Sequence, residues 1–209
     1  AVMAGLALLS AFSTVQTVRE RREARRANQE AEAARQVSDF LIGLFKVSDP
    51  GQARGNSVTA REILDRGAAK IERDLKDQPL VQARLMSTMG RVYDSLGLYD
   101  QALPLQEKAL AARRKLLGEA QLDVATSLID VGSVLWHRGE YERARPLFEQ
   151  GLALRERLLG PEAPLVADSL HNLGNLLWSR GEYDEARRRL TRALAIREKN
   201  APGSPDTAS

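Results

Sequence analysis

A stretch of eleven residues occurs twice in this chain with few changes, 42 positions apart. RGEYERARPLF begins at Arg138, and RGEYDEARRRL begins at Arg180. Internal periods of this length indicate stacked copies of one supersecondary unit. The chain is therefore predicted to fold as a linear array. The same step aligns residues in three consecutive copies: Gly90, Gly132 and Gly174; Gly97, Gly139 and Gly181; Tyr99, Tyr141 and Tyr183; Ala102, Ala144 and Ala186.

Each copy is predicted to form two helices. In the second copy, Val124, Leu128, Val131 and Leu135 recur at helical spacing, which places them on one face of a helix. Gly139 follows and marks the end of that helix, because glycine readily adopts the left-handed backbone that ends one. A second amphipathic pattern begins after the glycine, so the unit is a helical hairpin.

Small residues mark the predicted contact between the two helices of a hairpin. Gly132 on the first helix, with Ala144 and Gly151 on the second, would let the two backbones approach closely. A larger side chain at any of them would push the helices apart. Pro146 is expected in the first turn of the second helix, where a missing N–H costs little.

The third copy contains a characteristic series of large apolar, small and aromatic residues: Leu170, Leu173-Gly174, Leu177, Gly181, Tyr183, Ala186 and Ala193. This order resembles the signature of the tetratricopeptide repeat. The chain resembles this family from about residue 80 to residue 200. The common repeat has about 34 residues, so the period of 42 is similar to the kinesin-light-chain-type variant. The resemblance implies an all-α solenoid of helical hairpins. Gln106 departs from it, since a large apolar residue is expected there, and the second helix of the first copy is expected to pack less tightly.

The residues before the repeats suggest a membrane segment. Residues 1–18 carry no charge, and five arginines follow between residues 19 and 26. A span needs about 20 apolar residues, so 1–18 is predicted to be the end of a transmembrane helix, with a buried helix or a signal-peptide remnant as alternatives. Residues 19–46 have a narrow stripe of apolar residues at helical spacing. This pattern fits either a weak coiled coil or a solvated linker helix.

The predicted organisation follows from these patterns. In chain order it comprises the end of a transmembrane helix at 1–18, a juxtamembrane helix at 19–46, a loop and N-terminal capping helix at 47–79, repeats at 80–121, 122–163 and 164–200, and the start of a truncated fourth repeat at 201–209.

A second resemblance concerns the front of the chain. The phrases VSDFL, from Val37, and TAREILDRGA, from Thr59, precede the 42-residue repeats. This order is similar to the region that follows the kinase domain in bacterial membrane-bound eukaryotic-like serine/threonine kinases. It implies a catalytic domain upstream and repeats on the outer side of the cytoplasmic membrane. The arginines of 19–26 argue for the opposite sidedness. No Gly-rich loop, His-Arg-Asp or Asp-Phe-Gly motif occurs in the sequence.

Composition argues against a catalytic, metal-binding or nucleic-acid-binding function for this chain. It has no cysteine, so thiolate metal sites are excluded. His137 and His171 lack a full set of further ligands, with Asp168 the nearest candidate, and no catalytic, metal or cofactor site is predicted. A net charge of +3, spread over mixed helix faces, does not predict nucleic-acid binding.

The resemblance to tetratricopeptide repeats implies a ligand groove along the first helices. Its positions lie six and three residues before the signature glycine and one, four and five after it. Both tryptophans fall in it, either as anchors for a peptide or as packing between neighbouring first helices. The predicted groove residues are Arg84, Ser87, Arg91, Asp94 and Ser95; Thr126, Ile129, Ser133, Trp136 and His137; and Asp168, His171, Asn175, Trp178 and Ser179.

The sequence thus predicts a non-catalytic region that binds a protein or peptide in its concave groove, without a cofactor. The second resemblance makes it the sensor or scaffold part of a single-pass membrane-bound serine/threonine kinase. The alternative is the repeat region of a transcriptional or signalling regulator, or a helical module that contacts nucleic acid.

Overall fold

The computed structural model describes Arg35, Ser38 and residues 60–200. The chain divides into two compact units, Ala1–Gly67 and Ala68–Ser209, and the helical pairs discussed below lie in the second. The described residues form seven helices and no strand: α2 (Ala60–Asp74), α3 (Pro79–Ser95), α4 (Tyr99–Leu117), α5 (Leu122–His137), α6 (Tyr141–Leu159), α7 (Pro164–Ser179) and α8 (Tyr183–Asn200).

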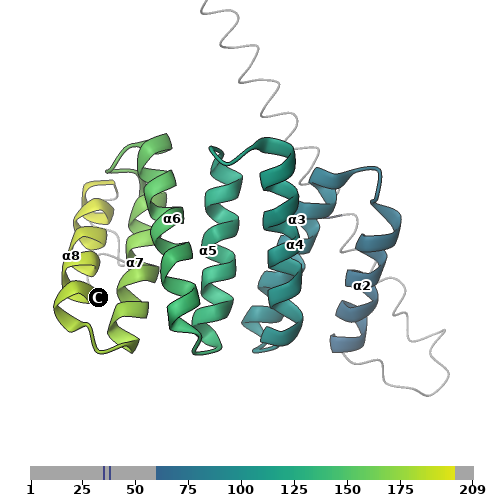
Figure 1. Cartoon of the computed structure of the whole chain (residues 1–209), viewed down its shortest axis with the longest axis horizontal. Helices are drawn as coiled ribbons and strands as arrows, with labels where there is room; N and C mark the ends of the chain where they lie inside the picture. Colours follow the sequence, from purple (N-terminus) through teal and green to yellow (C-terminus); the bar gives the residue numbers. More distant parts are fainter. Residues whose placement is uncertain (1–34, 36–37, 39–59, 201–209) are drawn as a thin grey trace, which may run out of the picture. The chain divides into compact units, whose positions relative to one another are not determined.

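Helices α3 to α8 form three hairpins that stack side by side (Figure 1). The pairs are α3 with α4, α5 with α6, and α7 with α8. Successive hairpins meet through α4 with α5 and α6 with α7, and each first helix also contacts the next first helix. The prediction of an all-α solenoid of helical hairpins is therefore confirmed.

A glycine with a left-handed backbone forms the turn inside each hairpin. Gly139 has a φ of 77°, which L side chains rarely adopt, and no atom lies within 4 Å of the place where its Cβ would be. Its N–H donates to the carbonyl of Trp136 at 2.9 Å, and Glu140 N–H donates to Leu135 at 2.9 Å. Glycine is needed here for its backbone freedom rather than for space.

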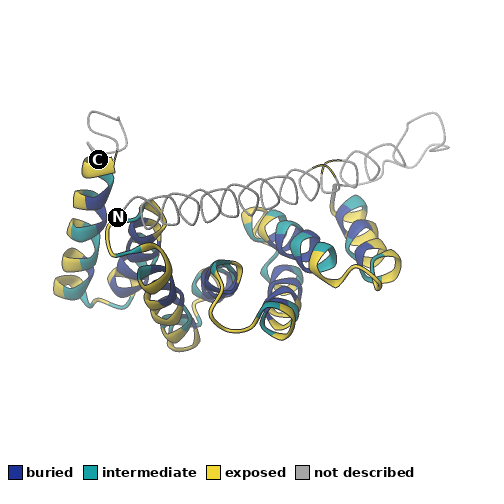
Figure 2. Ribbon diagram, turned by 90° about the horizontal axis from the view of Figure 1, so that it is seen from above, coloured by how far each residue is buried: buried dark blue, intermediate teal, exposed yellow. Residues whose placement is uncertain are grey.

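Two further glycines bring the helices of a hairpin together. A Cβ on Gly132 would lie 2.8 Å from the Phe148 ring, and one on Gly151 would lie 2.7 Å from Ile129 Cδ1. Ala144 is fully buried at the same contact. The buried faces of the paired helices are directed toward one another (Figure 2). The close approach predicted from the small residues is confirmed.

Two sequence-based expectations about packing are wrong. Pro146 lies inside α6, five residues after its first residue Tyr141, and the helix continues past it. Gln106 is fully buried, and its Nε2 donates to the Ser87 carbonyl at 3.0 Å. A Cβ on Gly90 would lie 2.7 Å from that Nε2, so the second helix of the first hairpin approaches this glycine as closely as Phe148 of α6 approaches Gly132.

Several predicted segments lie outside the described residues. These are the transmembrane segment 1–18, nearly all of 19–46, the loop before α2 and the residues 201–209. Among the helices that are described, none combines the length and hydropathy that crossing a bilayer requires.

Candidate ligand groove

The predicted groove residues lie on α3, α5 and α7, which follow one another along the array. Most of them are exposed or half-buried. Ser87 and Ile129 are exceptions, with 1% and 5% of their surface exposed. Because Ile129 packs on Gly151 of α6, it faces the hairpin interior. Neither residue offers a side-chain surface to a ligand in this structure.

Polar side chains connect each first helix to the next. His137 Nδ1 lies 2.8 Å from Asp94 Oδ1, and Trp136 Nε1 donates to Ser179 Oγ at 3.1 Å. Both contacts join residues 43 positions apart, which is one period plus one residue. Four predicted groove residues therefore hold neighbouring hairpins in register.

Asp130 forms a further connection that the sequence did not reveal. Its carboxylate accepts from Ser87 Oγ at 3.0 Å and from Arg91 Nη1 at 3.4 Å, both on α3. Burial raises the pKa of the Asp130 carboxyl, and Arg91, the Ser87 hydroxyl and Arg113 offset part of this rise. The only sequence signal was one acid in the apolar run LIDVG.

Two arginines of the second helices are buried at the junctions between hairpins. Arg113 of α4 and Arg155 of α6 are one period apart and are 8% and 5% exposed. Arg113 donates to Ser127 Oγ, and Arg155 donates to Ser169 Oγ at 2.9 Å. Desolvation lowers the pKa of both guanidinium groups. Each arginine thus links its own hairpin to the first helix of the next hairpin.

The third hairpin carries its own polar pair on α7. Asn175 Nδ2 lies 3.0 Å from His171 Nε2. Burial lowers the pKa of His171, Arg197 lowers it further, and Asp168 opposes the change. Asp168 is itself bound by Arg197 Nη2 at 3.2 Å. The asparagine side chain thus has a partner within its own helix.

The aromatic side chains gather where the first helices end. The His137 ring lies 4.8 Å from the Trp136 ring and 5.5 Å from the Tyr99 ring, centroid to centroid. The Trp178 and Tyr183 rings lie edge to face at 5.0 Å. Trp136 is half-buried between hairpins, as the packing interpretation expects, whereas Trp178 is 60% exposed.

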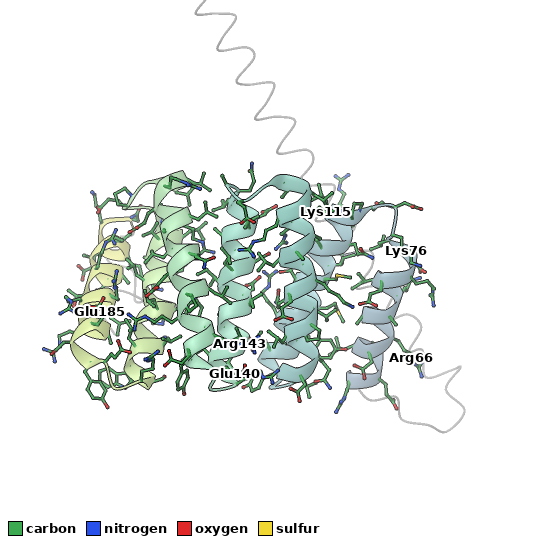
Figure 3. The ribbon with its side chains drawn as sticks, viewed as in Figure 1. Arg66, Lys76, Lys115, Glu140, Arg143 and Glu185 are labelled. Carbon is green, nitrogen blue, oxygen red and sulfur yellow. The ribbon has the colours of Figure 1, made fainter. Side chains whose placement is uncertain are left out.

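An ion pair lies within the turn of the second hairpin and another within the turn of the third. Together the turns inside the three hairpins, at residues 96–98, 138–140 and 180–182, form one edge of the array, here called the hairpin-turn edge. Figure 3 shows Glu140 and Arg143 together at this edge and Lys115 at the opposite one. Arg138 pairs with Glu140 at 2.7 Å, and Arg180 pairs with Glu182 at 2.7 Å.

The described residues contain no group of three or more metal-ligating side chains close enough to hold an ion. The candidate groove is a row of varied polar and aromatic side chains on α3, α5 and α7. Such a row offers hydrogen bonds, charges and ring faces to an extended ligand.

The chain matches the sequence profile described as tetratricopeptide repeat over residues 81–155 and 123–199. Among solved structures it is similar to BtubC (BKLC) from P. vanneervenii, with 24% identity and a TM-score of 0.62, covering 83% of this chain and 74% of that one. It is also similar to a Podosopora anserina protein described as a kinesin light chain with nearly identical TPR-like repeats. That match has 19% identity and a TM-score of 0.57 and covers 86% of this chain and 94% of that one. No curated protein matches the chain significantly.

Proposed function

Because the chain belongs to the tetratricopeptide repeat family, whose repeats generally bind proteins, we propose that it binds a peptide segment of a partner protein along α3, α5 and α7. The observation that supports this is the row of side chains that remain exposed on these helices. Arg91 and Asp168 have side chains that are each 54% exposed, and Trp178 is 60% exposed. Buried contacts hold the helices that carry them, so a ligand would meet a preorganised surface.

Selection from a random peptide library tests this function. The full chain should enrich peptides that bind it with micromolar affinity, measured by titration calorimetry. The substitutions Arg91→Ala and Asn175→Ala should each weaken that binding several-fold, since each removes one polar contact worth about 1 kcal/mol.

Gln150→Ala is the matched control, because Gln150 is exposed on the second helix α6. It should leave binding unchanged. If the control weakens binding as much as the two groove substitutions do, the ligand lies on the outer face and the proposal is wrong.

We further propose a more specific function for the chain. It is the sensor or scaffold part of a membrane-bound serine/threonine kinase whose catalytic domain lies upstream, with the repeats outside the cytoplasmic membrane. Its support is the front of the chain, where the phrases from Val37 and Thr59 precede the repeats. The uncharged residues 1–18 support the membrane part. The sequence upstream of Ala1 in the parent gene tests the kinase part, because Asp-Phe-Gly and His-Arg-Asp motifs must occur there.

Membrane attachment and sidedness have a separate test. The parent protein should stay with the membrane pellet after carbonate extraction, and protease added to intact spheroplasts should digest the repeats. Release by carbonate would contradict the membrane assignment, and protection from protease would reverse the sidedness.

A further inference from the structure

The two buried arginines differ in how many acceptors they reach. Arg155 of α6 donates to Ser169 Oγ at 2.9 Å, to the Leu165 carbonyl at 3.0 Å and to Thr126 Oγ1 at 3.3 Å. Arg113 of α4, one period earlier, donates only to Ser127 Oγ among the residues that the structure describes. Because a guanidinium has several N–H donors, Arg113 is buried with donors that this part of the chain leaves unused.

One position of the repeat accounts for the difference. In the second hairpin this position is Thr126, which accepts from Arg155. In the third hairpin it is Asp168, which accepts from Arg197 Nη2 at 3.2 Å. In the first hairpin it is Arg84, which is half-buried on α3 and forms no ion pair within residues 60–200. The first hairpin thus has a guanidinium where the other two place an acceptor for the arginine of the second helix.

A third guanidinium, that of Arg91, lies at the same junction. Arg91 follows Arg84 by about two turns on the same face of α3, and its side chain is 54% exposed. Its Nη1 lies 3.4 Å from Oδ2 of Asp130. Asp130 is three residues after Ser127, the acceptor of Arg113, so the two arginines reach the same face of α5. Arg84, Arg91 and Arg113 are called the arginine cluster below.

Acidic residues neutralise the arginine cluster only in part. Burial lowers the pKa of Arg113, Asp123 and Asp130 oppose this change, and Arg91 and Arg84 lower the pKa further. Burial also raises the pKa of the Asp130 carboxyl, which disfavours its charged form. Three guanidinium groups beside two carboxylates leave an excess of positive charge between the first and second hairpins. A bound anion would relieve the repulsion within the cluster.

We propose that the arginine cluster binds a phosphorylated side chain of the partner protein. Phosphoryl oxygens accept from Arg84 and Arg91, and they replace the acceptor that Arg113 lacks. A phosphoryl group carries about two negative charges and several acceptor oxygens, so it can pair with guanidinium groups that approach from different sides. A planar carboxylate, in contrast, is satisfied by a single guanidinium fork. This inference rests on the proposed function, since Arg84 and Arg91 belong to the predicted groove, and it adds the chemistry of one anchor of the ligand.

Two peptide libraries test the phosphate anchor on the full chain. Both are randomised around one fixed central residue, which is phosphoserine in one library and serine in the other. The best phosphopeptide is then titrated by calorimetry with and without its phosphate. The phosphorylated form should bind at least about tenfold more tightly, the effect of one or two charge-assisted hydrogen bonds. This advantage should shrink as salt is added, and glutamate in place of phosphoserine should recover little of it.

Arg84→Thr is the decisive variant, because it copies the second hairpin at this position. It should remove the preference for the phosphorylated peptide. It should also melt at the same temperature as the parent or higher, since Arg113 gains the acceptor that Thr126 offers to Arg155. Lost binding could then not be ascribed to unfolding. Arg157→Gln is the matched control, because it removes the same charge from an exposed position on the second helix α6. It should leave the preference unchanged.

Several results would overturn the proposal. These are equal affinity for the two forms of the peptide, a preference that survives in Arg84→Thr, and a preference that Arg157→Gln lowers equally. A lower melting temperature of Arg84→Thr would contradict the missing acceptor on which the proposal depends. Inorganic phosphate that binds as tightly as the phosphopeptide would show that the cluster takes any small anion. Phosphatidic acid vesicles that bind more tightly, and are lost in Arg84→Thr, would assign the cluster to a membrane instead. If random-library peptides still bind the groove in any of these cases, the proposed function stands and only the phosphate anchor is wrong.

Discussion

At the scale of single residues, Ala144 shows how tightly a hairpin closes. It is fully buried, as are its counterparts Ala102 and Ala186. Its neighbour Arg143 is 58% exposed and pairs with Glu140. One position along the helix thus separates the contact between helices from the solvated face.

Ala144→Glu should therefore destabilise the chain severely. It would bury an unpaired charge, which costs several kcal/mol of a total stability of about 5–15 kcal/mol. Arg143→Glu should cost about 1 kcal/mol or less, because it breaks an exposed ion pair. Thermal melts of the two variants should differ by many degrees. Coincident melting curves would mean that the 42-residue alignment is wrong.

Gln106 is a second residue whose environment can be tested. Its Oε1 is buried without a hydrogen-bond partner, while Leu190 packs on Gly174 at the equivalent position of the third hairpin. Gln106→Leu should stabilise the chain by about 1 kcal/mol, since a buried unsatisfied acceptor costs about 1–3 kcal/mol and a neutral hydrogen bond contributes about 1. Urea unfolding measures the difference, and a lower midpoint would show that the bond to Ser87 dominates.

Asp130 links stability to pH. Its folded-state pKa is raised by burial, so the folded chain binds this proton more tightly than the unfolded chain does. The stabilisation from protonated Asp130 is complete below the ordinary aspartate pKa and is lost as the pH rises through the raised value. Asp130→Asn should therefore be more stable than the parent at pH 7, and the advantage should shrink as the pH falls toward 4. Unfolding curves at a series of pH values decide this, and an advantage that grows in acid would contradict it.

At the scale of elements, the helices of the hairpins were predictable and the contacts between them were only partly so. Apolar periodicity and the aligned glycines identified paired helices in each copy, and these glycines do form the turns. The groove assignment remains a proposal, and Ser87 and Ile129 within it are buried. Arg113, Asp130 and Arg155 were missed, because periodicity reports where apolar residues lie and says nothing of which polar residues meet across a junction.

The turn glycine gives the prediction at this scale. Gly139→Ala should destabilise the second hairpin by about 1–2 kcal/mol, the cost of a left-handed backbone for a residue with a Cβ. No clash adds to this cost, because nothing lies within 4 Å of that Cβ. Gly139→Asn should cost less, since asparagine tolerates this region better. Chemical denaturation measures both variants, and an alanine variant as stable as the parent would show that the turn can relax.

At the scale of the whole solenoid, each of the three hairpins contacts only the hairpins beside it. Contacts such as those of Asp94 with His137 and of Trp136 with Ser179 bridge one period and no more. Stability is then close to a sum of hairpin terms and junction terms. A substitution that destabilises one hairpin should also lower the stability of the adjacent hairpins through the junction side chains. It should have little effect on hairpins further away.

This neighbour-only pattern has a mechanical consequence. When the two ends of the array are pulled apart, the hairpins bear the load in series, and each can open while the rest stay folded. The step between aligned glycines such as Gly132 and Gly174 is 42 residues, and at about 3.6 Å of extended chain per residue each opening would release about 150 Å. Force spectroscopy should show a staircase of such steps rather than one rupture. A chain that is anchored at one end and bound to a partner at the other would therefore act as a graded spring.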